Sequence, residues 1–313
     1  MTNDGASTRP PTGAESRAGK RAVARQKARE LRLEQRKKDV RNRRLLQGGI
    51  IVAAILVVAI VAVTIWSQIP SARTGPVNML SDGIKIGEGF IAETTPGLKP
   101  GDEPVPSEVT PGSEIIDIRI YLDYQCPGCR VFEETNHAQL ATWVETGAAT
   151  VEFHPIALFD RHSLGTKFST RAANAAACVA NYSPDAFFDF NSLMFANQPE
   201  EGTEGLTDEQ IIVLAKRADV ISTELIEKCV NDQNYKTWVN ASTARAIAGP
   251  IPNSKVERVA STPTVIVNGV QYGGALDDAE AFATFVSTSA GNAFTEKSTL
   301  ETPTPTPTPV PAE

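Results

Sequence analysis

The sequence predicts an α/β fold that is interrupted by an all-helical insertion and preceded by one transmembrane helix. Three observations support this fold class. A strand, a helix and a second strand follow one another within residues 114–155, and β-type patterns return only after residue 250. Residues 156–249 show helical periodicity instead. Near the amino terminus, residues 48–66 form an apolar run whose only polar side chain is Thr64.

The first 45 residues form a basic arm. They contain 14 of the 30 Lys and Arg residues but only 5 of the 37 Asp and Glu residues, which leaves 16 against 32 in the remainder. An acidic globular part argues against nucleic acid as its partner. We therefore interpret residues 1–45 as a cytoplasmic arm next to anionic lipid, where each cation contributes about 1 kcal/mol.

The apolar run predicts a signal anchor over residues 46–68, because it is long enough to cross the bilayer as a helix. A cleaved signal peptide is the alternative, but no clear small-residue cleavage site follows the run. Lys and Arg cluster before the span, so the amino terminus is expected in the cytoplasm. The chain is thus predicted to be a single-pass protein of the cell membrane, with every later residue on the extracytoplasmic side, where disulfides are permitted.

Residues 69–113 are rich in Pro, Gly and Ser and predict a flexible linker. Within residues 82–89, apolar and polar residues alternate over a short stretch, which predicts an added edge strand. Residues 115–122 then alternate as a core strand, and a helix is expected from about Cys129 to Thr146, lined by one apolar face: Val131, Phe132, Leu140, Trp143 and Val144. Residues 149–154 form the second strand of a right-handed βαβ unit.

A Cys-Pro-Gly-Cys sequence lies between the first strand and its helix. Pro127 suits a first helical turn, so Cys126 is expected at a helix amino terminus, where the unpaired amides and the helix dipole stabilise a thiolate. Cys129 is one turn further on and can close a small disulfide ring with Cys126. We expect an exposed Cys126 of low pKa that carries out thiol–disulfide exchange; an inert disulfide or half of a metal site is the alternative.

Together with the strand before it, the segment Asp-Tyr-Gln-Cys-Pro-Gly-Cys, residues 123–129, resembles the thioredoxin-like disulfide oxidoreductases. It is most similar to the membrane-anchored form of the bacterial disulfide-bond-forming (DsbA-like) branch, over roughly residues 83–290. The resemblance implies a thioredoxin-like domain formed by residues 114–155 and 250–290, with residues 156–249 as the helical insertion. It also implies that a loop with a cis proline, here Thr262-Pro263, faces the cysteine pair and binds extended substrate chains.

The insertion shows four helical faces, centred near residues 172, 190, 214 and 226. After it, Asn268-Gly269 between two β-prone runs predicts a type I′ hairpin. A last helix is expected from Asp277 to about Thr288, and the Thr/Pro-rich tail of residues 291–313 predicts an extended spacer.

Cys178 and Cys229 are separated by 51 positions and lie on predicted helices of the insertion. On the extracytoplasmic side we expect a structural disulfide between them; two buried free thiols are the alternative. The four cysteines do not have the spacing of a zinc site. Asp123 and Glu133 are candidates for proton transfer to Cys129. The resemblance leads us to expect a histidine in the turn of strong oxidants, and His137, His154 and His162 all lie elsewhere.

These observations predict a membrane-anchored thiol–disulfide oxidoreductase that introduces disulfides into secreted proteins. Its only cofactor is the cysteine pair; no metal, nucleotide or flavin is implied. The resemblance implies two kinds of partner, reduced cysteine-containing secreted proteins and a membrane oxidase, for example one similar to vitamin K epoxide reductase. The alternatives are a disulfide reductase or isomerase, for example in cytochrome maturation, and a tethered binding ectodomain in which the CxxC disulfide is only structural.

Overall fold

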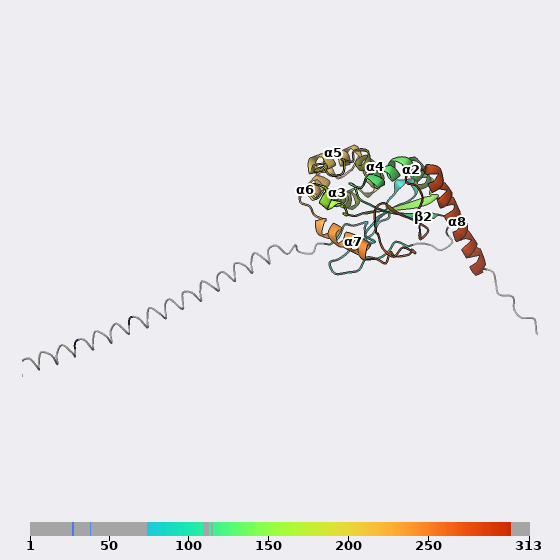
Figure 1. Ribbon diagram of the computed structural model, residues 1–313, viewed down its shortest axis with the longest axis horizontal. Coiled ribbons are helices and arrows are strands. Elements are labelled where there is room, and N and C mark those ends of the chain that lie inside the picture. The colour runs from blue at the N-terminus through green and yellow to red at the C-terminus, as the bar shows by residue number, and fades with distance from the viewer. Residues whose placement is uncertain (1–26, 28–37, 39–73, 109–112, 114, 302–313) are drawn as a thin grey trace, which may run out of the picture. The chain divides into compact units, whose positions relative to one another are not determined.

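The computed structural model describes residues 74–108, 113 and 115–301, together with Lys27 and Lys38; residues 292–301 are described as backbone only (Figure 1). Apart from those two lysines, the predicted basic arm and the anchor of residues 46–68 lie outside the described residues. Within the described ranges, no helix is both long enough and apolar enough to cross a membrane. The chain divides into two compact units, Met1–Pro70 and Ser71–Glu313, and every element named below belongs to the second.

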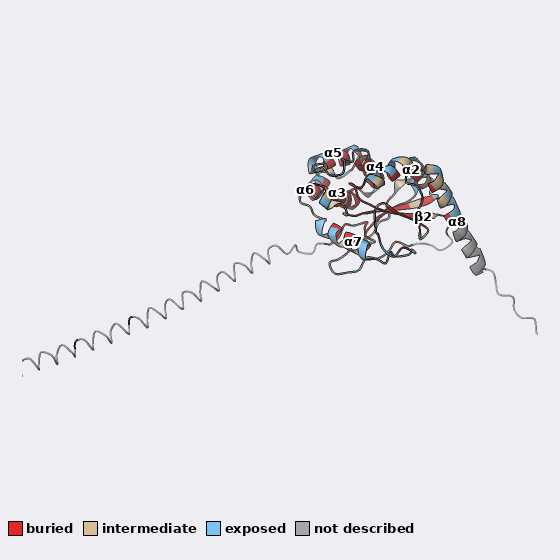
Figure 2. Cartoon of the chain, viewed as in Figure 1, coloured by how far each residue is buried: buried red, intermediate tan, exposed pale blue. Residues whose placement is uncertain are grey.

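A five-stranded mixed sheet in the order β1-β3-β2-β4-β5 is the centre of this unit. Strands β2 (Ile116–Leu122) and β3 (Ala149–Pro155) are parallel neighbours, as the predicted βαβ unit requires. Strand β4 (Thr264–Val267) is antiparallel to β2, and β1 (Ile84–Ile86) is antiparallel to β3. The predicted edge strand and both core strands are therefore confirmed. The two parallel strands are buried almost throughout (Figure 2).

The hairpin between β4 and β5 (Val270–Gln271) has the predicted turn. Asn268 and Gly269 both have positive φ, 47° and 78°, which is the conformation that a type I′ turn needs. The Asn268 side chain also accepts a hydrogen bond from the backbone N–H of Asp117 at 2.9 Å, which fixes the end of β4 against β2.

Helix α2 (Pro127–Glu145) connects the parallel strands and packs on the sheet with one face. This face differs from the predicted one, because Val131 is 38% exposed and Trp143 is only partly buried. Phe132, Asn136, Leu140 and Val144, spaced four residues apart, form the buried face instead. Phe132, Leu140 and Val144 of the predicted face are confirmed, and Trp143 packs against the core while partly buried; Val131 was wrong. The prediction also left out Asn136, a polar residue that is fully buried and donates to the carbonyl of Phe132.

Five helices and two short 3₁₀ segments occupy the insertion, where four helices were predicted. The helices are α3 (Phe168–Tyr182), α4 (Phe187–Ala196), α5 (Asp208–Arg217), α6 (Thr223–Asn231) and α7 (Lys236–Ala248). The prediction missed α7 because its buried face combines Trp238 and Val239 with Ser242 and Thr243, which give little apolar periodicity. In Figure 1, α3, α5 and α6 lie together, and the terminal helix α8 (Ala279–Glu301) lies on the other side of β2.

The segment of residues 74–108 packs against the domain, so the prediction of a flexible linker is wrong for this part of residues 69–113. Met79 is fully buried in the main core and Leu98 is also buried. The amide of the Asn78 side chain donates to the carbonyl of Ala180 at 2.9 Å, across 102 residues of sequence. The second correction is at the carboxyl end, where α8 continues to Glu301 and enters the predicted extended tail of residues 291–313.

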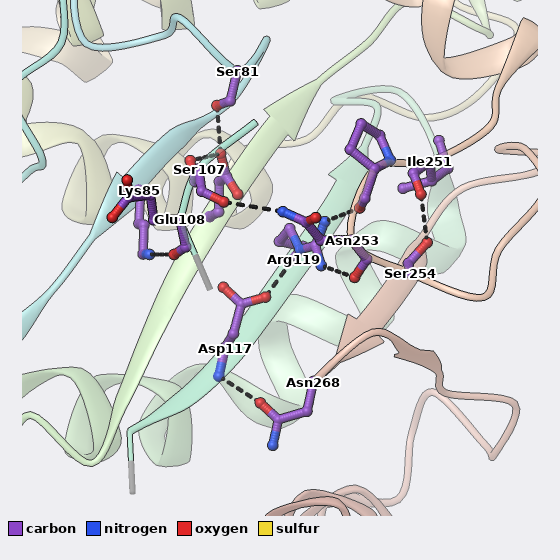
Figure 3. Close-up of polar contacts among 12 residues, drawn as sticks. Ser81, Lys85, Ser107, Glu108, Asp117, Arg119, Ile251, Asn253, Ser254 and Asn268 are labelled. Carbon is purple, nitrogen blue, oxygen red and sulfur yellow. Dashed lines mark hydrogen bonds and ion pairs between the residues drawn. The ribbon is translucent and has the colours of Figure 1, made fainter. Parts of the chain in front are cut away.

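The two faces of the sheet are covered by different kinds of side chain. Ile118 and Ile120 point into the main core with α2 and the insertion, while Tyr121 belongs to a smaller core that includes Ile251 and Ile266. The polar residues of β2 are buried on this second face as well. Arg119 donates to the Asp117 carboxylate at 3.0 Å and to the carbonyls of Pro252 and Asn253 at 2.6 and 2.7 Å (Figure 3).

Candidate active site

Cys126 is the N-cap residue of α2. Its backbone is extended (φ −77°, ψ 118°), and Pro127 provides the first helical residue. The Cys126 carbonyl accepts from the amides of Cys129 and Arg130 at 3.1 and 3.3 Å, as the first carbonyl of a helix does. The Cys126 sulfur is therefore located where the free amides and the positive end of the helix dipole are available to an anion.

The loop of residues 262–263 lies next to this sulfur. The Thr262–Pro263 peptide bond is cis, and Cys126 Sγ is 3.1 Å from the Thr262 carbonyl oxygen. The antiparallel pairing of Thr264 with Tyr121 brings the loop across the start of α2. A Cβ atom on Gly128 would be 3.3 Å from both the Pro263 and the Leu276 side chains, so the turn between the cysteines has little room for a larger residue.

The two thiols are free, and their environments shift their pKa values in opposite directions. A hydrogen bond from the Cys129 thiol lowers the pKa of Cys126 to about 7, against the opposing effect of burial, and Thr262 and the Cys129 amide lower it further. Burial raises the pKa of Cys129 well above its ordinary value, and its neighbour Cys126 adds to this shift. At neutral pH the pair therefore has one thiol close to ionisation and one that stays protonated.

The predicted exposed position of Cys126 is wrong, because the residue is only 3% exposed. The cause is tertiary and involves the helical insertion. Gln198, which follows α4, donates from its side chain to the Cys126 carbonyl at 2.9 Å, and the Thr262 carbonyl contacts the Cys126 sulfur at 3.1 Å. Gln125 is fully buried and donates to the His162 carbonyl at 3.2 Å. Gln125 stands in the segment of residues 123–129, but its buried contact was not predicted, and no pattern marks Gln198.

Of the two candidate proton carriers, Asp123 is held by backbone groups. Its carboxylate accepts from the amides of Gln125, Leu158 and Phe159 at 2.8, 2.7 and 2.9 Å. Burial nevertheless raises the pKa of Asp123 to about 6. The bonds from Leu158 and Phe159 fasten the loop before Cys126 to the loop after β3. The charge of Asp123 also raises the pKa of both Cys126 and Cys129.

Glu133 is four residues after Cys129 on the same helix, and His137 follows four residues later. The Glu133 side chain is 7% exposed and lies 3.0 Å from Nδ1 of His137, which is 35% exposed. The hydrogen bond to Glu133 raises the pKa of His137. The helix thus aligns a buried thiol, a buried carboxyl group and a partly exposed imidazole along one face.

The second cysteine pair is bonded. Cys178 of α3 and Cys229 of α6 form a disulfide with an S–S distance of 2.06 Å, and both residues are at most 1% exposed. It joins two helices of the insertion that pack against each other. In the part of the chain that the structure describes, no group of three or more His, Cys, Asp or Glu side chains is arranged to hold a metal ion.

Fold and site together define a thioredoxin-like protein with a CxxC dithiol at the first turn of the helix between its parallel strands. The chain belongs to the thioredoxin family: the family model described as Thioredoxin matches residues 116–287, which is more than half of the chain. Its homologues are thiol–disulfide oxidoreductases. Disulfide bond formation protein D of Bacillus subtilis (strain 168) is 26% identical over 147 residues, or 47% of this chain. The match spans 60% of that protein's length.

The chain is also similar to solved structures. The reduced form of the disulfide bond oxidoreductase DsbG from Mycobacterium tuberculosis is 24% identical with a TM-score of 0.50, over 68% of this chain and 93% of that one. The oxidised BdbD of Bacillus subtilis is 20% identical with a TM-score of 0.49, over 70% and 98% of the two chains. The likeness to the first of these structures shows the fold alone.

Proposed function

We propose that this protein is a membrane-anchored, extracytoplasmic thiol–disulfide oxidoreductase that introduces disulfides into secreted proteins through Cys126 and Cys129. The observation that carries the proposal is the asymmetry of the pair, in which Cys126 has a pKa of about 7 next to a cis-proline loop and Cys129 is buried with a raised pKa. An inert structural disulfide has no need for two thiols of such different acidity.

In the oxidised enzyme, the thiolate of a substrate cysteine attacks the sulfur of Cys126. The bond between Cys126 and Cys129 breaks, a mixed disulfide forms, and Cys129 takes up a proton. A second substrate thiolate then attacks the substrate sulfur of the mixed disulfide, and Cys126 leaves as a thiolate. The substrate loses two electrons and two protons in total, and the cysteine pair gains the two electrons.

Three features assist these steps. The helix amino terminus and the Cys129 thiol stabilise Cys126 as the leaving thiolate. The partly exposed loop of Thr262 and Pro263 would pair with an extended substrate chain as an added strand. Two carboxyl groups are candidates for carrying the proton to and from the buried Cys129. Asp123 is the one whose charge acts on both cysteines. Glu133 follows Cys129 by one helical turn and is hydrogen-bonded to His137.

A disulfide reductase or isomerase is the second candidate, and one observation favours it. The pKa of about 7 at Cys126 is close to the value of about 7 for thioredoxin and well above the value of about 3.5 for the strong oxidant DsbA. Because a more stable thiolate makes a dithiol a stronger oxidant, the reduction potential of the pair decides between the two directions. A potential near −270 mV, the approximate value for thioredoxin, supports the reductase; one near −120 mV supports the oxidase.

The anchor, the lipid contact and the recharging partner belong to the same proposal. The apolar residues 48–66 and the basic arm before them support a single span with the amino terminus in the cytoplasm. A membrane oxidase, for example one similar to vitamin K epoxide reductase, would return the reduced pair to the disulfide. Protease treatment of intact cells tests the orientation: the domain is expected to be digested while the basic arm is protected, and a protected domain would contradict it.

Oxidation of a reduced test protein by the full chain tests the activity. We expect the wild-type protein to regenerate disulfides and a folded Cys126→Ala variant to fail. A variant that keeps its activity would place the reaction elsewhere. A variant that loses its fold would favour the tethered ectodomain, in which the CxxC disulfide has only a structural role.

A further inference from the structure

The chain enters the folded domain at a fixed place, beside α7 and the carboxyl end of α3. Gly75 lies on Trp238 of α7, where a Cβ atom would come within 2.9 Å of the indole ring. Two residues later, the Val77 N–H donates to the Asn181 side chain in the last turn of α3 at 3.0 Å. These contacts determine the side of the domain on which Thr74, the first residue of the continuous described chain, lies.

The tether in front of Thr74 is short. The inference below rests on the anchor of the proposed function, whose apolar run ends at Trp66, so that only residues 67–73 remain as the tether. A chain of about seven residues spans at most about 25 Å when it is fully extended. A compact domain of about 200 residues is roughly 40 Å across. The side around Thr74 therefore faces the bilayer, and the opposite side cannot reach it.

Exposed apolar side chains lie on this same side. Ile221 is 87% exposed, and its N–H donates to the hydroxyl of Ser183, the C-cap of α3, at 3.0 Å. It is thus held at the same end of α3 as Val77, which is 37% exposed. Leu225, in the first turn of α6, is 52% exposed. Helices α3, α6 and α7 lie together in Figure 1. We call Val77, Ile221 and Leu225 the apolar patch.

The fold does not bury Ile221, although its position in the sequence would allow this. An apolar residue just before a helix N-cap often packs against the fourth residue of that helix. Ser222 is the N-cap of α6, so the partner would be Ile226. Ile226 is 1% exposed and belongs to the core, while Ile221 stays outside it. Because removing apolar surface from water is favourable, Ile221 still has burial to gain from a surface outside the domain.

The charges around the patch select neither an acidic nor a basic surface. The exposed charged residues nearest to Ile221 in the sequence are of both signs: Arg217, Asp219 and Glu224. Three apolar side chains are too few to hold a free protein on a bilayer. A short tether changes this, because it makes the contact intramolecular, with an effective concentration in the millimolar range. The bilayer is the apolar surface that the tether keeps within reach of the patch.

We propose that the domain docks on the outer surface of the cell membrane through the apolar patch, with Ile221 and Leu225 inserted between the lipid headgroups. Docking holds the domain in one orientation above the bilayer. Since the contact depends on apolar burial, it should form on neutral phosphatidylcholine. It should change little when anionic phosphatidylglycerol or salt is added, because screening acts on charges.

Quenching by phosphatidylcholine with brominated acyl chains tests the contact in the full chain reconstituted into vesicles. Ile221→Trp and Leu225→Trp place a reporter in the patch, in a Trp66→Phe background that removes the tryptophan of the anchor. After subtraction of the background protein, we expect brominated lipid to lower the reporter emission at least about twofold, because the ring lies at the depth of the upper acyl chains. The matched control is Val270→Trp on β5, at the edge of the sheet opposite β1, and it should not be quenched.

A second variant tests whether the patch acts as a unit. In the Leu225→Trp protein, Ile221→Ser should lower the quenching at least about twofold, because the tethered contact loses its most exposed apolar side chain. The Ile221 side chain is 87% exposed and its hydrogen bond to Ser183 comes from the backbone, so the fold stays intact. Val270→Ser in the same protein should leave the quenching unchanged.

Three results would overturn the docking proposal while leaving the redox function in place. The first is quenching of Ile221→Trp no stronger than that of Val270→Trp. The second is a blue shift of the reporter without quenching, which would show that a second copy of the chain covers the patch. The third is equal quenching with and without Ile221→Ser. Failure of the anchor gives a different result: alkaline carbonate would then remove the chain from the vesicles, which would contradict the anchor and the docking together.

Discussion

The two cysteine pairs of this protein are equally buried and yet differ in every other respect. Cys126 and Cys129 are 3% and 2% exposed, and Cys178 and Cys229 are 0% and 1% exposed. The first pair is three residues apart at a helix amino terminus and is free, whereas the second joins two helices across 51 residues and is bonded. Burial therefore does not distinguish a reactive pair from a structural one. Loop length and the local electrostatic field do.

The physical reason lies in what each bond constrains. A disulfide across 51 residues removes many conformations from the unfolded chain, while one across three residues removes few. The Cys178–Cys229 bond is therefore suited to stabilising the fold. Reducing Cys126–Cys129 lowers the free energy of unfolding only a little. The helix terminus and the opposite pKa shifts of its two thiols suit the first pair to exchange instead.

The largest expected effect is on the rate of disulfide transfer, which should depend on Cys126 and not on the Cys178–Cys229 bond. We expect Cys126→Ala to lower the rate of disulfide transfer to a reduced test protein by at least about 10³-fold, because the attacked sulfur is gone. Its melting temperature should change by no more than a few degrees. The matched variant is Cys178→Ala with Cys229→Ala, which should keep most of its activity well below its melting temperature. The comparison fails if both variants lose activity to the same extent while folded.

The second effect separates the pairs by stability. Removing the Cys178–Cys229 bond is expected to lower the free energy of unfolding by about 4 kcal/mol, the chain-entropy value for a loop of this length. Reducing Cys126–Cys129 alone should change it by much less. Urea denaturation of the protein without the Cys178–Cys229 bond, and of the protein with only Cys126–Cys129 reduced, gives the two changes in the free energy of unfolding. Equal losses would show that the CxxC pair is a structural disulfide too.

Much of the fold could be predicted because short stretches of neighbouring residues are enough to identify its strands and turns. The alternation of residues 116–122 and the Asn268-Gly269 turn each follow from a few neighbouring residues. The packing of residues 74–108 was missed because isolated apolar residues such as Met79 and Leu98 lie among Pro and Gly, without a period. The position of Cys126 at the start of a helix was predictable. Its burial was not, because it involves Gln198, which is 72 residues away in the sequence and donates to the Cys126 carbonyl.

The third prediction concerns pH. The rate of Cys126 alkylation by iodoacetamide should rise about tenfold per pH unit below its pKa and level off above about pH 7. Cys129 should not react in the folded protein, because its pKa is raised and it is buried. A midpoint near 9, the ordinary value for a thiol, would show that the helix terminus and Cys129 do not stabilise the thiolate.

The same shift predicts how stability depends on pH. The pKa of Cys126 falls from about 9 in the unfolded chain to about 7 in the fold, so folding is coupled to proton release between these values. The contribution of Cys126 to the stability of the reduced protein is therefore fully present above about pH 9 and is lost as the pH falls to about 7. The oxidised protein, which has no such thiol, should lack this dependence.

The fourth prediction addresses the cover over Cys126. Replacing Gln198 by Ala removes the side chain that donates to the Cys126 carbonyl. We expect the pH-independent rate of alkylation to rise about two- to fivefold, since the loss of one hydrogen bond of about 0.5–1 kcal/mol makes the loop easier to open. The control is Asn197→Ala. Asn197 is the neighbour of Gln198, but the side chain of Asn197 donates to the Leu193 carbonyl of α4. Equal rates in the two variants would indicate that the cover does not limit access.

The smallest expected effect lies in the Thr262 hydroxyl. It lowers the pKa of Cys126, although its oxygen has no hydrogen-bond partner within normal geometry in the described residues and the Thr262 carbonyl is the group that contacts the sulfur. Thr262→Val keeps the shape of the side chain and removes the hydroxyl, so the pKa of Cys126 should rise while the loop keeps its conformation. A rise of a few tenths of a unit corresponds to about 0.5 kcal/mol, and it should make the reduction potential more negative by about 10 mV. A matched change on the same loop, Ser261→Ala, should leave both values unchanged, because that side chain has no role in the shift. If Thr262→Val leaves the pKa of Cys126 in place, the stabilisation of the thiolate comes from α2 and Cys129 alone, and the loop of residues 262–263 is reserved for substrate binding.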